Sequence, residues 1–161
     1  MKIKKMLSLC VGTIGFIPTL LLAQTSATAI VTFTISSISS ISVSGNPAAF
    51  NISAATPGNP HNSATDTSTT YALTTNATAQ RIQGSIDTAM PSGVALTITL
   101  AAPSTGTSTG PTSMTTTPQN LVTGISNVAQ SGLGITYTLS ASAAAAPVAS
   151  ASRTVTYTIG P

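Results

Sequence analysis

Apolar residues alternate with small or hydroxyl-bearing residues along much of this chain, and this period of two constrains its fold most. The segment Val94–Leu100 shows it clearly, because valine, leucine and isoleucine occupy every second position and alanine or threonine the positions between them. Alternate side chains of a β-strand point to opposite faces. Each such segment therefore predicts a strand with one apolar face and one hydroxyl face. Threonine suits the outer face because its branched Cβ fits a pleated strand.

Similar alternation recurs from residue 31 to residue 159, with turn-forming residues between the segments. Glycine, proline and asparagine occur together at Gly45–Pro47 and at Pro57–Asn62, where they favour turns. The alternating segments are 31–35, 41–43, 50–54, 71–75, 82–86, 94–100, 133–139 and 155–159, with a weaker one at 120–125. Eight or nine short strands with such turns predict an all-β fold, a single antiparallel sandwich or barrel.

The last two strands are predicted to form a terminal hairpin with a long tip. The Ala143–Ala146 run is the one candidate helix, but it is short and Pro147 follows it directly. Helix nucleation makes so short a piece unfavourable. We therefore assign residues 141–152 to the connection between the strands 135–139 and 154–159.

The N-terminus has the three parts of a secretory signal peptide. Lys2, Lys4 and Lys5 precede an apolar run from Met6 to Leu22, and small residues follow at Ala27-Thr28-Ala29. We predict cleavage after Ala29, with a cut after Ala23 as the alternative. A retained transmembrane anchor is the rival interpretation, but a run of 17 residues interrupted by Pro18 is short for a membrane span.

This interpretation divides the chain into a signal peptide, residues 1–29, and one β-sandwich domain, residues 30–161. It places the protein outside the cytoplasm: secreted, at the cell surface or in the periplasm. Cys10 lies in the signal peptide, where Leu9 is a poor match to a lipoprotein cleavage box, so we expect a mature chain without cysteine and without a membrane span.

The predicted mature chain has almost no ionisable side chains. Its charges are Arg81, Arg153, Asp66 and Asp87, and its only histidine is His61. No basic cluster is available for phosphate contacts, so we expect no nucleic-acid partner. A lone histidine without nearby ligands predicts no metal site, and we expect neither a cofactor nor an enzymatic activity.

Three catalytic or metal-binding alternatives depend on these few residues. Asp66 and Asp87 each precede threonine, but both lack the glycine of an aspartic-protease turn. The same two carboxylates could contribute to a calcium site, but no acidic loop motif is present. A serine–histidine–aspartate triad would need His61. We instead expect Asp66 in a polar loop or at a strand start, and Asp87 at a strand end, pairing with Arg81 or Arg153.

The segment Arg153–Pro161 resembles the closing strand of bacterial fimbrial and spore-coat-U-type secreted domains, which also end in an alternating Thr/Val/Tyr strand. The segment Ile30–Ile35 is similar to their first or donor strand. The chain is also similar in style to WxL-type surface domains, although it has no tryptophan. The resemblance implies an immunoglobulin-like sandwich at the cell surface, and it transfers no binding residue.

These features favour a non-enzymatic secreted or surface structural protein, such as a fibre, coat or matrix subunit. The alternative is an adhesion module that binds carbohydrate or another surface protein. The terminal strands contain no lysine and no internal proline, the residues that usually protect exposed strand edges. Either they pair within one sandwich, or Val31, Phe33 and Ile35 form an assembly strand that completes another copy or another surface subunit.

Overall fold

The computed structural model describes residues 25–161. Most of the predicted signal peptide, including Cys10 and the apolar run from Met6 to Leu22, lies outside the described residues. The chain divides into two units, of which Ile35–Pro161 is compact. The preceding described residues, 25–34, carry no strand or helix.

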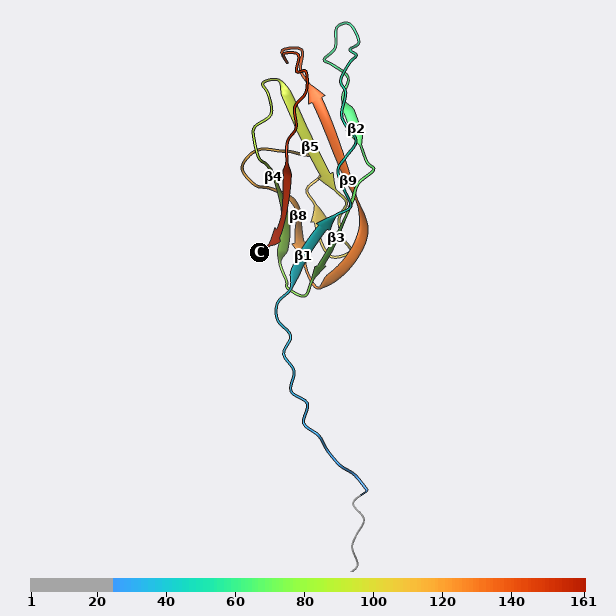
Figure 1. The fold of residues 1–161 in the computed structure, drawn as a ribbon, viewed down its shortest axis with the longest axis vertical. Helices are drawn as coiled ribbons and strands as arrows, with labels where there is room; N and C mark the ends of the chain where they lie inside the picture. The colour runs from blue at the N-terminus through green and yellow to red at the C-terminus, as the bar shows by residue number, and fades with distance from the viewer. Residues whose placement is uncertain (1–24) are drawn as a thin grey trace, which may run out of the picture. The chain divides into compact units, whose positions relative to one another are not determined.

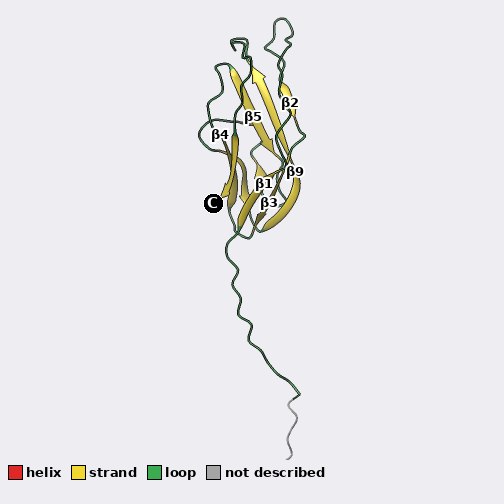
Figure 2. Ribbon diagram, viewed as in Figure 1, coloured by secondary structure: helices red, strands yellow, loops and turns green. Residues whose placement is uncertain are grey.

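The described residues form ten strands and no helix, which confirms the all-β class that the alternating pattern predicts (Figure 2). The strands are β1 (Ser39–Val43), β2 (Ala64–Asp66), β3 (Thr70–Thr75), β4 (Gln80–Ile86), β5 (Val94–Leu100), β6 (Thr107–Ser108), β7 (Thr112–Ser113), β8 (Gln119–Ile125), β9 (Val128–Ala141) and β10 (Val155–Gly160). Seven of them coincide with, or extend, segments expected from the sequence.

The strands build two antiparallel sheets that form a β-sandwich (Figure 1). The first sheet has the order β1-β3-β9-β5-β7, and β2 pairs with the C-terminal half of β9. The second sheet has the order β10-β4-β8-β6. The long strand β9 pairs with β3 through its first half and with β5 through its second half.

The core consists of the apolar faces that the alternation predicts. In β5, Leu96, Ile98 and Leu100 are buried, and the residues between them are only partly covered. Tyr71 and Tyr137 are also buried and belong to the core. The remaining buried apolar side chains are Leu73, Ile82, Ile86, Met114, Leu121, Val122, Ile125, Val128, Leu133 and Ile135.

The predicted terminal hairpin is wrong. Strand β9 lies in the first sheet, whereas β10 pairs with β4 in the second sheet. Residues 142–154 form the connection, which is long enough to cross between sheets. The two strands meet only through side chains, where the Tyr157 hydroxyl donates a hydrogen bond of 2.9 Å to the Tyr137 hydroxyl.

Two expected strands are absent from the sheets of the described residues. The segment 50–54 is irregular, and only the neighbouring Ala55 forms a bridge, with His61. The segment 31–35 belongs to neither sheet. Conversely, the short strands β2, β6 and β7 were not expected, because two or three residues carry no readable period.

Candidate functional site

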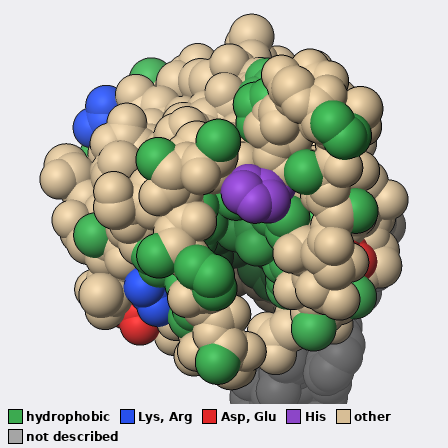
Figure 3. Space-filling view, turned by 90° about the horizontal axis from the view of Figure 1, so that it is seen from above, with side chains coloured by type: hydrophobic (Ala, Val, Ile, Leu, Met, Phe, Trp, Pro, Cys, Tyr) green, Lys and Arg blue, Asp and Glu red, His purple; other side chains and the backbone are tan. Residues whose placement is uncertain are grey.

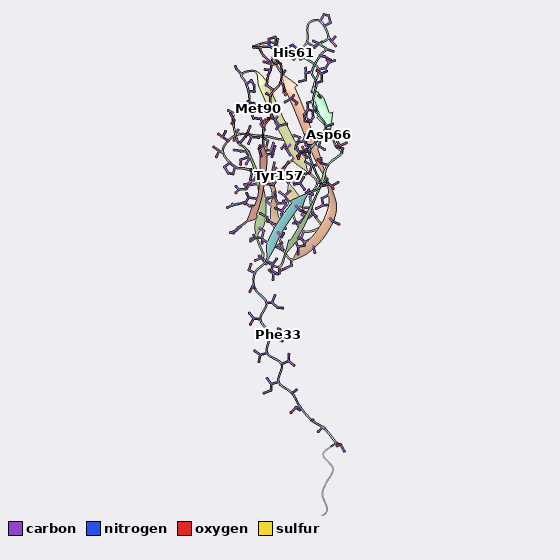
Figure 4. All side chains as sticks on the ribbon, viewed as in Figure 1. Phe33, His61, Asp66, Met90 and Tyr157 are labelled. Carbon is purple, nitrogen blue, oxygen red and sulfur yellow. The ribbon has the colours of Figure 1, made fainter. Side chains whose placement is uncertain are left out.

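The ionisable residues singled out in the sequence are dispersed over the sandwich. His61 lies at one end, where its Nδ1 is 3.1 Å from the carbonyl oxygen of Ser142, and Asp66 lies on β2 (Figure 4). The Asp66 carboxylate accepts hydrogen bonds from the Ser68 hydroxyl at 2.8 Å, the Ser68 N–H at 3.0 Å and the Ala48 N–H at 3.3 Å. These donors, the Ser68 hydroxyl foremost, lower the pKa of Asp66 below its usual range. The carboxylate therefore stabilises the chain around Ser68 and Ala48 through these hydrogen bonds.

Asp87 and Arg153 connect the end of β4 to the start of β10. Their hydrogen bonds go to backbone groups, and not to each other as the sequence predicted. Asp87 Oδ1 accepts hydrogen bonds from the backbone N–H groups of Thr154 at 3.0 Å and Thr88 at 2.9 Å. Arg153 donates to the carbonyl oxygen of Ala89 through Nε at 3.1 Å and Nη2 at 2.9 Å. Both side chains therefore hold the last strand in place.

In the part of the chain that the structure describes, no three His, Cys, Asp or Glu residues gather where a metal ion could bind. Nor does any helix there have the length and apolarity to span a membrane. Seen from one end, the surface consists mostly of backbone and uncharged side chains, with few charged side chains, and the histidine side chain lies next to hydrophobic side chains (Figure 3).

Two depressions on the described surface are lined by side chains that carry no formal charge. The larger, of about 320 Å³, is lined by Ile38, Thr74, Thr75, Asn76, Asn127, Val128 and Ala129. The smaller, of about 180 Å³, is lined by Ser42, Val43, Ser44, Thr70, Tyr71, Ala72, Ser131 and Gly132. Tyr71 contributes to the second, but its hydroxyl donates to the carbonyl oxygen of Ala101, and burial raises its pKa to about 12.

The most exposed large apolar side chains lie in residues 30–35, which we call the N-terminal extension. Ile30 is 97 % exposed, Val31 80 %, Phe33 79 % and Ile35 75 %. Phe33 is labelled in Figure 4. Burying one such side chain is worth roughly 1.5–3 kcal/mol, so four exposed together constitute a surface that gains free energy from a partner.

A second incompletely covered apolar surface lies where the edge strands of the two sheets meet. Strand β1 ends the first sheet, β10 ends the second, and the two lie next to each other. Among the strand pairs of residues 25–161, none joins them. The inward side chains at this β1–β10 seam are Ile41, Val43, Val155, Tyr157 and Ile159. Val43 is 36 % exposed and the others are partly buried.

The partial exposure at the seam contrasts with the neighbouring strand. Val155 and Ile159 pair with Ile86 and Ile82 of β4, which are 3 % and 0 % exposed. Apolar side chains are thus fully buried on β4 but only partly buried on the adjacent strand β10. Strand β10 is less well covered because no strand lies beyond it in its sheet.

The free edge of β10 also presents backbone hydrogen-bonding groups. The Asp87 N–H donates to the Thr154 carbonyl oxygen at 3.1 Å, which marks a hydrogen-bonded position of the β4–β10 pair. Such positions alternate along an antiparallel ladder. The N–H and C=O groups of Val155, Tyr157 and Ile159 therefore point away from β4, where an added strand would meet them.

The sequence identified the extension, but not the seam. The inward residues of β10 show the same alternation as those of a central strand, so their incomplete burial depends on strand order. Comparisons of this chain with family models, with curated proteins and with solved structures find no match.

Proposed function

We propose that this protein is a non-enzymatic structural subunit of an exported bacterial fibre, coat or matrix, with an immunoglobulin-like sandwich as its building block. Subunits join by strand addition: the N-terminal extension of one copy pairs with the free edge of β10 in another copy or in a related surface subunit. One observation carries the proposal, namely that a single chain has both an uncovered alternating apolar segment and an edge strand with partly uncovered apolar side chains.

The chemistry of the two surfaces supports this pairing. Val31, Phe33 and Ile35 alternate with threonines, so an extended strand of this sequence has one apolar face. That face matches the inward apolar residues of the β1–β10 seam, and the backbone of the added strand satisfies the free N–H and C=O groups of β10. Neither surface carries a charged side chain, so association faces no charge repulsion.

Photo-crosslinking tests the proposal directly. A photoreactive benzoylphenylalanine at position 33 reacts with whatever lies against the extension, so no register has to be assumed. In cells that export the full chain, we expect a ladder of covalent dimers and larger species. Peptide mapping should place the crosslinks in residues 155–160 or 39–43 of a second copy or of a related subunit.

The matched control places the same group at position 50. Phe50 packs against the core, so its substitute should crosslink only within its own chain. The proposal is overturned if position 33 gives only internal crosslinks or none, and the purified protein sediments as a monomer at high concentration.

The alternative function is a carbohydrate-binding surface module. A row of hydroxyl side chains crosses the outer face of the first sheet, because Thr138 of β9 is opposite both Thr65 and Thr97, and Thr97 is opposite Ser113. The Thr65 and Thr138 hydroxyls lie 3.3 Å apart. Retention of a monomer on a glycan array, lost on replacing Thr97 and Thr138 by valine, would favour this alternative.

A further inference from the structure

The N-terminal extension is close enough along the chain to pair with its own sandwich. Only Ser36, Ser37 and Ile38 separate it from β1, which begins at Ser39. Hairpin loops of two to five residues are the commonest connections between antiparallel strands. A reversal at residues 36–38 would therefore let the extension cover the β1–β10 seam of its own chain. The extension would then not be available to pair with another subunit.

Asn76 binds this short connection through three hydrogen bonds. Its Oδ1 accepts from the Ile38 N–H at 2.7 Å, and its Nδ2 donates to the Ser36 carbonyl oxygen at 2.9 Å. Its own backbone N–H donates to the Ile38 carbonyl oxygen at 3.2 Å. The side-chain amide thus acts like one more peptide group of β3 and prolongs the β1–β3 ladder beyond Ser39, which pairs with Thr75.

The turn that carries Asn76 is itself well anchored. The Ala77 N–H donates to Thr75 Oγ1 at 3.1 Å, and the Ala77 carbonyl oxygen accepts from the Asn127 N–H at 3.1 Å. The Ala79 N–H donates to Ser126 Oγ at 3.2 Å. Asn76 therefore binds residues 36–38 from a turn that is itself held by hydrogen bonds.

The connection has little capacity to reverse while these bonds exist. A tight hairpin turn needs positive φ angles, which glycine, asparagine and aspartate tolerate best, and Ser36-Ser37-Ile38 contains none of them. A reversal would also have to break the bonds from the Ile38 N–H and to the Ser36 carbonyl oxygen. Both local sequence and the Asn76 contacts therefore favour an extended connection.

We infer that Asn76 is the positioning residue that makes the extension available to a partner subunit rather than to its own seam. This inference rests on the proposed function. Removing the two side-chain hydrogen bonds should let residues 36–38 turn back, so that the extension covers the seam of its own chain and assembly is lost.

The test combines Asn76→Ala with the photoreactive group at position 33 in the full chain. The ratio of internal to intersubunit crosslinks should rise roughly 5- to 100-fold, the effect expected from losing two hydrogen bonds. Asn120→Ala is the matched control, because it removes a side-chain bond of 3.1 Å to Gln83 on the other sheet. It should leave the ratio unchanged.

A second variant leaves Asn76 intact in case Asn76→Ala does not fold. Replacing Ser36 by asparagine and Ser37 by glycine creates a dipeptide that favours the hairpin turn, and it should raise internal crosslinking in the same way.

The possible outcomes separate the two proposals. If the parent and both variants give equal intersubunit ladders, the role of Asn76 is refuted and the proposed function stands. If the parent itself gives only internal crosslinks or none, and sediments as a monomer at high concentration, both are refuted.

Discussion

At the scale of single residues, Gly84 shows how closely the core is packed around β4. It lies on β4 opposite Tyr157, and an added Cβ atom would lie 2.7 Å from Leu121 Cδ1 and 3.3 Å from Met114 Sδ. Leu121 is completely buried, so it has little freedom to move aside. A side chain at position 84 would therefore strain the core.

We predict that Gly84→Ala lowers the free energy of unfolding by about 1–3 kcal/mol, the usual cost of overpacking a core. Gly134→Ala is the matched control, because Gly134 is also in a strand but a Cβ there meets no atom within 4 Å. Urea unfolding of both variants checks the prediction. Equal effects at the two positions would contradict it.

At the scale of elements, the N-terminal extension and β10 carry the proposed assembly. All of the extension except Ile35 precedes the compact unit Ile35–Pro161, and the extension contributes no strand to either sheet. Deleting residues 30–36 should therefore leave the sandwich folded, with an unchanged circular dichroism spectrum, but unable to form multimers. If the deletion unfolds the protein, the segment is an internal strand.

The alternation of the extension provides a sharper test of the same assembly. Phe33→Lys places a charge on the apolar face and should weaken association about ten- to one-hundred-fold, because burial of one phenylalanine is lost. Thr34→Lys adds the same charge on the opposite face of the strand and should have little effect. Sedimentation velocity measures both variants, and equal losses would exclude a strand with one buried face.

At the scale of the whole molecule, the scarcity of ionisable groups determines how stability depends on pH. Residues 30–161 contain two aspartates, one histidine and no glutamate, so few protons are linked to folding. Two tyrosines matter at high pH: burial raises the pKa of Tyr71, which is 2 % exposed, from 10.0 to about 12, and burial also raises the pKa of Tyr157.

We predict a nearly constant free energy of unfolding from about pH 5 to pH 9. The unfolded state loses the Tyr71 proton above its pKa of 10.0, whereas the folded state retains it to about 12. The contribution of Tyr71 to stability is therefore complete below pH 10 and is lost as pH rises toward 12, by up to about 3 kcal/mol for two pKa units.

Chemical denaturation at a series of pH values measures this dependence. Tyr71→Phe should reduce the loss above pH 10, and because the pKa of Tyr157 is also raised by burial and by its bond to Tyr137, some dependence should remain. A steep loss between about pH 5 and pH 9 would instead show that His61 or an aspartate is essential to folding.

The sequence by itself determined most of the longer strands and their buried faces. In β5 and in the C-terminal half of β9, a period of two specifies both, because alternation is a local property of the extended backbone. The tertiary structure decided which segments pair with one another in the sheets. The segment 50–54 alternates but finds no ladder, and the two-residue strands β6 and β7 exist only because neighbours pair with them.

Strand order is the clearest case of a property that only the tertiary structure decided. The alternation of β10 is the same whether it joins β9 in a hairpin or crosses to β4, and packing of the two sheets selects β4. That choice leaves β10 at an edge and its apolar residues partly uncovered. The contact of Asn76 with Ile38 likewise requires β1 and β3 to be paired. The alternation could be predicted from the sequence because it involves residues that are neighbours in the chain. The β1–β10 seam of the candidate site could not be predicted, because it lies between segments that only folding brings together.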